Sequence, residues 1–205
     1  MNYPNGKQQK NHTTIIYGNR GMNFEDDINI TNEYYRQNDI AIIYKKPTPI
    51  TINKVDYPSR INAVIKEAHF KIPSTTDYNG IYKGKYIDFE AKETRLKYFP
   101  LSNIHKHQID HLERIIKHGG IGFILVNFKL ADKIYLLFGT DLFNFIKNET
   151  RKSIPIDYFE KYGFLIKPKY NPRIDYLKII DEVYFKEVEK WKIFLRIKII
   201  LSLLL

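Results

Sequence analysis

The chain contains no cysteine, which excludes disulfide bonds and thiolate metal sites. Any structural zinc would therefore need histidine and carboxylate ligands. Long apolar runs are also missing, since the most apolar stretch, Ile199–Leu205, is far shorter than the roughly 20 residues that span a bilayer. The segment Met1–Thr14 is polar and contains no apolar core of a signal peptide. We therefore expect a cytoplasmic protein.

Acidic residues are scarce relative to basic ones, with 23 Asp and Glu against 33 Lys and Arg. The resulting charge of +10 and pI near 9.4 favour a polyanionic partner, with nucleic acid first and an anionic membrane second. Some small basic proteins nonetheless bind nothing in particular. The 16 Tyr and 13 Phe suit the stacking or wedging of bases, although most of these rings should lie in the core.

The length fits one domain with an excursion. Residues 1–18 are polar, lack periodicity and are expected to form a basic, flexible tail. A helix should follow, because apolar residues then recur at helical spacing, and the acidic residues near its start suit the helix dipole. The members of this stripe are Phe24, Ile28, Thr31 and Tyr35. A short β-branched strand is expected over Asp39–Tyr44.

The segment from Lys45 to Lys71 contains three prolines, six basic residues and only two acidic ones. Its apolar alternation is weak, so we interpret it as a partly extended, basic excursion from the main body. Loops of this length inside compact domains are usually functional or disordered. A solvated insertion explains the composition equally well.

A hairpin is predicted where Asn79-Gly80 and Lys83-Gly84 punctuate aromatic and β-branched residues. A turn at Lys83-Gly84 would set Asp77 opposite Glu90. Since side chains alternate along a strand, Asp88, Glu90 and Lys92 would then share one face. Two carboxylates and an amine at one place suit metal-assisted phosphodiester hydrolysis. A solvated strand face with a cross-strand ion pair is the ordinary alternative.

A helix is expected between Ser102, as its N-cap, and Gly119, as its stop. Its apolar face contains one polar member, Gln108, which needs a partner such as a metal or its water shell. His107 and His111 have the spacing of a zinc pair but lack the intervening Glu of metalloproteases, so satisfied or solvent-facing histidines are favoured.

The rest of the chain predicts further strands and helices. Strands are expected over 122–128 and 133–138, and helices follow from a Thr140 or Asp141 cap to Lys147, over 156–162 and over 175–189. This order indicates an α/β fold with a mixed central sheet covered by helices on both faces.

Several blocks in order resemble the RecU-type Holliday junction resolvases of the PD-(D/E)xK nuclease superfamily. The resemblance extends from about Tyr17 to Tyr184. The blocks are Asn19-Arg20-Gly21-Met22 with Phe24-Glu25, Ser74-Thr75-Thr76-Asp77-Tyr78, Asp88-Phe89-Glu90-Ala91-Lys92-Glu93-Thr94 and His107-Gln108. The resemblance implies a restriction-endonuclease-like core over 19–190, with the segment at about 45–71 as a protruding stalk.

The resemblance also implies residue roles. Asp77 and Glu90 match magnesium ligands, for which Mn²⁺ is a plausible substitute, Thr75 and Gln108 match further metal-shell positions, and Lys92 matches the catalytic lysine. Glu25 is an additional acidic candidate. The candidate DNA-binding residues are Arg20, Lys45, Arg60 and the stalk wedge Phe70.

The implied activity is symmetrical nicking of four-way DNA junctions by a homodimer, in recombination, repair and chromosome segregation. RecA recombinase is a candidate partner, no membrane is required, and the expected location is the nucleoid. The alternatives are a linear-duplex nuclease of the same superfamily and a non-catalytic DNA- or recombinase-binding module.

Two features depart from the pattern. Thr76 stands where the superfamily name has proline, which fits the family, and residues 191–205 match nothing in it. A species-specific helix, a membrane-surface helix or a translation-frame artefact would each explain this extension, and the first is favoured.

Overall fold

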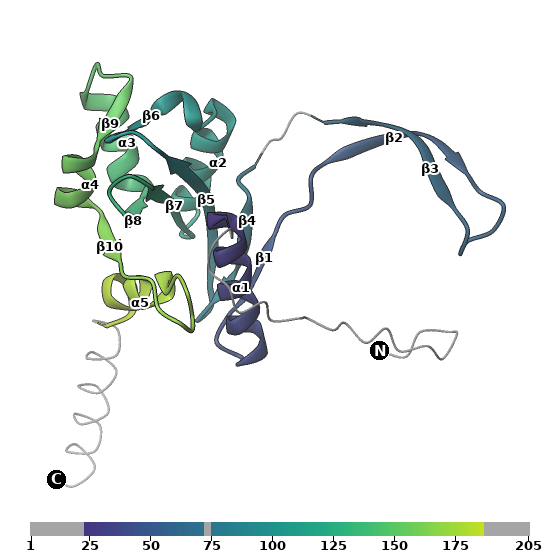
Figure 1. The fold of residues 1–205 in the computed structure, drawn as a ribbon, viewed down its shortest axis with the longest axis horizontal. Coiled ribbons are helices and arrows are strands. Elements are labelled where there is room, and N and C mark those ends of the chain that lie inside the picture. The colour runs from purple at the N-terminus through teal and green to yellow at the C-terminus, as the bar shows by residue number, and fades with distance from the viewer. Residues whose placement is uncertain (1–22, 72–74, 187–205) are drawn as a thin grey trace, which may run out of the picture.

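The computed structural model describes residues 23–71 and 75–186, which form a body and a projecting hairpin (Figure 1). The strands are β1 (Ile42–Lys45), β2 (Ile50–Asp56), β3 (Val64–Phe70), β4 (Tyr78–Tyr82), β5 (Lys85–Thr94), β6 (Tyr98–Pro100), β7 (Ile121–Phe128), β8 (Lys133–Phe138), β9 (Ser153–Pro155) and β10 (Phe164–Ile166). The helices are α1 (Phe24–Gln37), α2 (Lys106–Lys117), α3 (Gly139–Asn148), α4 (Ile156–Tyr162) and α5 (Tyr176–Ile180), with a short 3₁₀-helix η1 (Leu101–Asn103) and a π-helix η2 (Asp181–Phe185) that continues α5.

A six-stranded sheet in the order β1-β4-β5-β7-β8-β10 forms the centre of the body. β5 and β7 are parallel, while every other neighbouring pair in this sheet is antiparallel. The parallel pair requires a crossover, and α2 provides it. The mixed sheet with helices on both faces, predicted from the order of elements, is confirmed.

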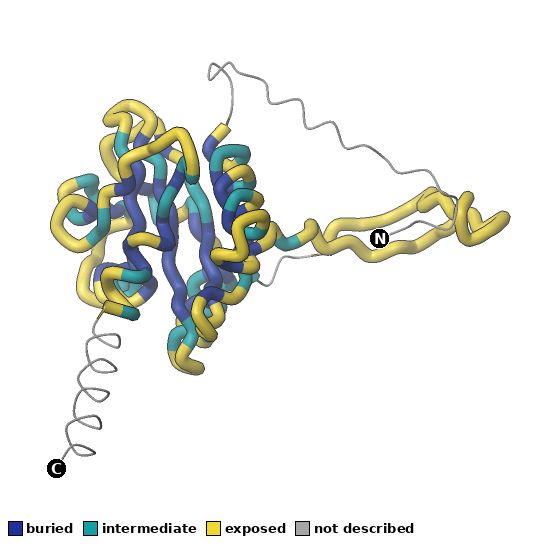
Figure 2. The backbone as a smooth tube through the Cα atoms, turned by 90° about the horizontal axis from the view of Figure 1, so that it is seen from below, coloured by how far each residue is buried: buried dark blue, intermediate teal, exposed yellow. Residues whose placement is uncertain are grey.

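Two apolar clusters pack on opposite faces of this sheet. The first joins α1 and α5 to the face that contains Ile87 and Phe89. The second joins α2, α3 and α4 to the face that contains Ile124 and Val126. Figure 2 shows the buried strands between these layers. Since alternate residues of β5 point to opposite faces, Asp88 and Glu90 lie on the α2 side.

Helix α1 is the element that the sequence predicted best. Its buried residues include all four members of the predicted stripe, Phe24, Ile28, Thr31 and Tyr35. Asn23 caps the helix by accepting a hydrogen bond from the Asp26 N–H at 2.8 Å. The acidic first turn therefore has a structural role in addition to its charge.

The boundaries of three other elements differ from the sequence predictions. Ser102 does not cap α2, because it lies in the 3₁₀-helix η1, and His105 precedes α2 instead. Phe138, rather than Thr140 or Asp141, precedes α3, since strand β8 runs directly into the helix. The strand expected over Asp39–Tyr44 begins only at Ile42, because the chain turns at Asp39 with a φ of 52°.

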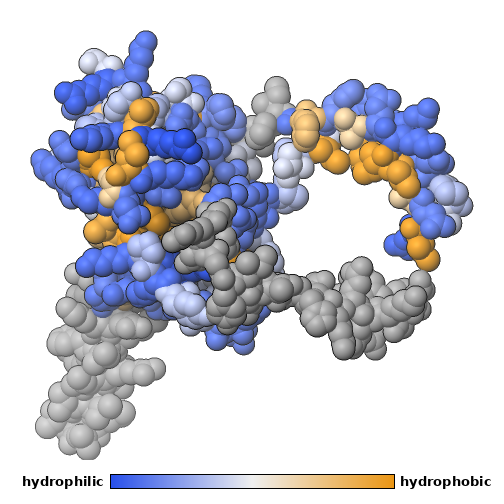
Figure 3. Space-filling model, viewed as in Figure 1, coloured by the Kyte–Doolittle hydropathy of each residue, from blue (hydrophilic) through white to orange (hydrophobic). Residues whose placement is uncertain are grey.

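The segment between β1 and β4 projects from the body as an antiparallel hairpin of β2 and β3, which we call the stalk. Both strands are exposed throughout, as Figure 2 shows. Figure 3 shows apolar residues along the concave side of the stalk and hydrophilic residues along its outer side. Within the described residues, no helix has the length and apolar character needed to cross a membrane.

Candidate functional site

The β4–β5 hairpin creates the site, and its predicted register is confirmed. Tyr78 pairs with Phe89 and Tyr82 with Lys85, so the turn lies at Lys83-Gly84. Both turn residues have positive φ, 47° and 77°, as a tight two-residue hairpin turn requires. Continuing this register by one residue places Asp77 opposite Glu90, and the Asp77 N–H donates to Glu90 Oε2 at 3.1 Å.

Glu90 is the most perturbed acid of the site. Its side chain is fully buried, and Lys92 Nζ lies 2.6 Å from its Oε1. Apart from this ion pair, that oxygen has no partner among the described residues. The pKa of the Glu90 carboxyl is raised to about 7: burial is the largest cause and the Asp77 side chain adds to it, while Lys92 opposes the rise. An under-satisfied buried carboxylate of this kind suits a cation.

A cleft of about 230 Å³ opens beside these residues. Asp77, Lys92 and Glu25 all line it, so the start of α1 contributes an acidic group to the same space as the hairpin. Glu25 also forms an ion pair with Lys45 at the end of β1. The structure therefore brings together the two predicted metal ligands, the predicted catalytic lysine and the additional acidic candidate.

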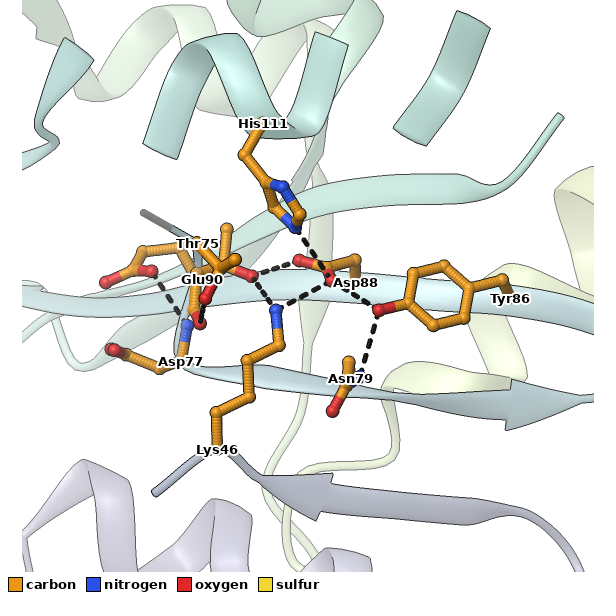
Figure 4. A network of polar contacts seen from close by, with 9 residues as sticks. Lys46, Thr75, Asp77, Asn79, Tyr86, Asp88, Glu90 and His111 are labelled. Atoms are coloured by element: carbon orange, nitrogen blue, oxygen red, sulfur yellow. Dashed lines mark hydrogen bonds and ion pairs between the residues drawn. The ribbon is translucent and has the colours of Figure 1, made fainter. Parts of the chain in front are cut away.

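The other two predicted metal-shell residues have different surroundings. Thr75 precedes Asp77 by two residues and is half-buried, and Figure 4 shows Thr75, Asp77 and Glu90 gathered together. Gln108 is only 4% exposed. Its Oε1 accepts a hydrogen bond from the His105 N–H at 2.9 Å, so the predicted need for a partner is met by the start of α2.

Of the candidate DNA-binding residues that the structure describes, Lys45 alone approaches the cleft, through its ion pair with Glu25. Arg60 lies in the loop between β2 and β3 and is exposed. Phe70 ends β3 with 82% of its surface exposed, which is unusual for a large apolar side chain. Arg20 lies outside the described residues, as do the predicted tail at 1–18 and the extension at 191–205.

Sequence reasoning missed a polar network beside the cleft. Asp88 is fully buried and contacts Lys46 and His111, at 2.8 and 3.1 Å. Tyr86 and Thr76 complete its partners. His111 is thus a satisfied histidine, as favoured. Alternation already placed Asp88 on this face, but no local pattern could show that Lys46, 42 residues away, is its counter-ion.

Two carboxylates with an adjoining lysine fit a hydrated divalent cation better than a closed cage. Among the described residues, no three His, Asp or Glu side chains are arranged as a ready metal cluster. Magnesium usually keeps several waters and needs only one or two protein carboxylates, so Asp77 and Glu90 suffice. The fold and cleft define a mixed α/β protein with a carboxylate–lysine centre on a hairpin.

Comparison with known proteins identifies the family. The family model "Recombination protein U" (RecU) matches residues 19–182, and the chain belongs to this family. The chain is similar to the Holliday junction resolvase RecU of Geobacillus sp. (strain WCH70), with 55% identity over 82% of this chain and 86% of the relative. It is also similar to that of Bacillus cereus (strain AH820), with 51% identity over 90% of this chain and 98% of the relative.

A solved structure also matches at a lower level. It is that of Archaeoglobus fulgidus Hjc, a Holliday junction resolvase, with a TM-score of 0.43 and 12% identity over 69% of this chain and 93% of that one. At this similarity the match supports no conclusion about function.

Proposed function

We propose that the protein is a divalent-metal-dependent endonuclease that resolves four-way DNA junctions by symmetrical nicks. One observation supports this most directly. The hairpin sets Asp77 against Glu90, with Lys92 2.6 Å from Glu90, in a chain whose relatives are named Holliday junction resolvases. These are the groups that metal-assisted phosphodiester hydrolysis needs.

Asp77, Glu90 and the backbone carbonyl of Ala91 would hold Mg²⁺, with Mn²⁺ as a substitute. Thr75 and Gln108 would contact it directly or through water. When bound, such a cation polarises the phosphate and lowers the pKa of a bound water. The fully buried Oε1 of Glu90, which among the described residues is met only by the Lys92 ammonium, supports this assignment.

Lys92 would have two successive partners. In the structure its ammonium balances Glu90 at 2.6 Å and lines the cleft with Asp77. With a cation held by the two carboxylates, the Lys92 ammonium would no longer be needed to balance Glu90, because the cation would neutralise the same charge. Lys92 can then orient the attacking water and stabilise charge that develops on the phosphoryl group.

The stalk and the charge of the chain account for the choice of substrate. Phosphate contacts from Lys45, Arg60 and Arg20 would supply affinity that falls steeply with salt. The exposed Phe70 would act as a wedge at the open centre of a junction. A homodimer presents two identical sites about a two-fold axis, which matches the symmetry of an open junction. We place this activity in the cytoplasm, at the nucleoid, with RecA recombinase as a further partner.

The decisive experiment incubates purified protein with a mobile four-way junction, in Mg²⁺ and in chelator, and resolves the products strand by strand. Wild type should give paired nicks in Mg²⁺ only. Asp77→Ala and Lys92→Ala should lose nicking and still bind the junction, while the surface controls Asp157→Ala and Lys161→Ala should keep both. Retained nicking by either site variant would reject the residue assignment.

Two further outcomes separate the alternatives. Faster cleavage of a linear competitor than of the junction would indicate a duplex nuclease of the same superfamily. Junction binding without nicking under any divalent metal would indicate a binding module. A chain with residues 48–73 replaced by a tight turn should lose junction preference more than duplex affinity, and equal losses would reject the role of the stalk.

A further inference from the structure

The buried Asp88 carboxylate has more side-chain partners than a single counter-ion would provide. The Asp88 carboxylate is fully buried and has four side-chain partners. Lys46 Nζ lies at 2.8 Å, the Tyr86 hydroxyl at 3.0 Å and His111 Nε2 at 3.1 Å, and Thr76 Oγ1 donates to the remaining oxygen. Figure 4 shows these groups converging on Asp88 beside the candidate metal ligands.

Lys46 is attached to the metal-binding segment in two ways. Its backbone N–H donates to the Asp77 carbonyl at 2.7 Å, which continues the β1–β4 ladder one step beyond the pair Lys45 and Tyr78. Its ammonium donates to Thr76 Oγ1 at 3.0 Å as well as to Asp88. Lys46 therefore forms hydrogen bonds with both the backbone of Asp77 and the side chain of Thr76.

Lys46 is also the first residue of the chain that leaves β1 for the stalk. The Thr75–Asp77 segment is where the chain returns from the stalk to β4. The two roots of the stalk are thus joined to each other, and through Asp88 to β5, which supplies Glu90 and Lys92. Lys46 therefore links the start of the stalk to the segment that contains Asp77 by hydrogen bonds.

We propose that Lys46 is a positioning residue for the nuclease centre. It fixes Asp77 opposite Glu90 and couples the stalk root to the metal ligands, and this inference rests on the proposed function. The physical reason is that ligand carboxylates bind a cation well only when surrounding groups hold them in place. Partners of this kind typically change metal affinity or activity by about 10- to 100-fold when removed.

The test variant is Lys46→Met, which keeps the backbone N–H and the side-chain length and removes only the ammonium. Without DNA, we expect its Mn²⁺ affinity, measured by titration calorimetry, to fall about 10- to 100-fold. Nicking of a junction at saturating DNA should fall by a similar factor, while junction affinity in chelator stays within twofold. The control Lys133→Met removes a lysine at the start of β8 that is paired with Glu160 of α4, and it should change none of these quantities.

A simpler role is that the ammonium only neutralises a buried acid. The double variant Lys46→Met/Asp88→Asn removes both charges and leaves no unpaired buried ion. It therefore replaces the single variant in the measurements if Lys46→Met unfolds. If Lys46 positions Asp77, the double variant stays folded and keeps the defect in Mn²⁺ affinity. Recovery of wild-type affinity and nicking in the double variant would overturn the proposal.

The Mn²⁺ titration contains no DNA, so it separates this inference from the proposed function. A wild type that binds Mn²⁺ but leaves junctions intact would count against the function alone. Equal Mn²⁺ affinity in wild type and in folded Lys46→Met would count against the positioning role alone, whatever the cleavage assay shows.

Discussion

The buried carboxylate of Glu90 should make the metal-free protein less stable at neutral pH than a variant that lacks it. Its pKa of about 7 exceeds the ordinary 4.5 by about 2.5 units, and each unit is worth about 1.4 kcal/mol. The folded state therefore loses roughly 3 kcal/mol relative to the unfolded state as the pH rises from 4.5 past 7. The sign follows from burial, which favours the protonated form in the folded protein.

The perturbation is Glu90→Gln, which cannot ionise and still offers an oxygen to the Asp77 N–H. In chelator at pH 8 the free energy of unfolding of the variant should exceed that of wild type by up to about 3 kcal/mol. For a domain of this size this corresponds to a Tm that is higher by roughly 6–12 °C. At pH 5 most of this difference should be absent, because wild-type Glu90 is then largely protonated. Thermal unfolding followed by circular dichroism at both pH values measures the effect.

The exposed Glu113→Gln is the matched control and should leave Tm unchanged at both pH values. Adding Mg²⁺ at pH 8 should raise the Tm of wild type and not that of Glu90→Gln. A difference between variant and wild type that is the same at pH 5 and pH 8, or a variant that is less stable at pH 8, would refute the reasoning.

Three further predictions follow from the same sheet. Mn²⁺ affinity should rise about tenfold per pH unit below 7 and level off above it, because the cation must displace the Glu90 proton; a flat profile in calorimetry would contradict this. Phe89→Ala should lower the free energy of unfolding, measured by urea titration, by about 3–5 kcal/mol, since Phe89 is fully buried between aromatic rings. A decrease under 1 kcal/mol would exclude that packing. Gly80→Ala should cost about 1–3 kcal/mol, because its Cβ would lie 2.0 Å from the Ile42 carbonyl oxygen, and an unchanged Tm would show that β1 can move aside.

The hairpin and its acids could be predicted because their determinants are local. The turn residues Lys83 and Gly84 and the alternation along β5 fix which side chains meet, and both lie within a short stretch of sequence. Helix α1 was predictable for a similar reason, since its apolar stripe repeats at a single period.

The remaining features depend on distant partners. From the local sequence Asp88 resembles a surface acid, because the residues that contact it in the fold, Lys46 and His111, are distant from it in the sequence. Ser102 has a side chain typical of a helix N-cap, but it lies within η1, and helix α2 starts only at Lys106. The short pairing of β6 with β9 joins segments some 55 residues apart, which no local pattern reveals.

The alternation along β5 has a consequence for how its residues can vary. On one side Phe89 stacks between Tyr78 and Phe123, with ring centroids 4.8 Å away on each side. On the other side its neighbours Asp88 and Glu90 are fully buried and face the α2 layer. Substitutions at Ile87 and Phe89 should therefore lower the yield of folded protein, whereas Glu90→Gln and Lys92→Met should yield folded protein that does not nick DNA.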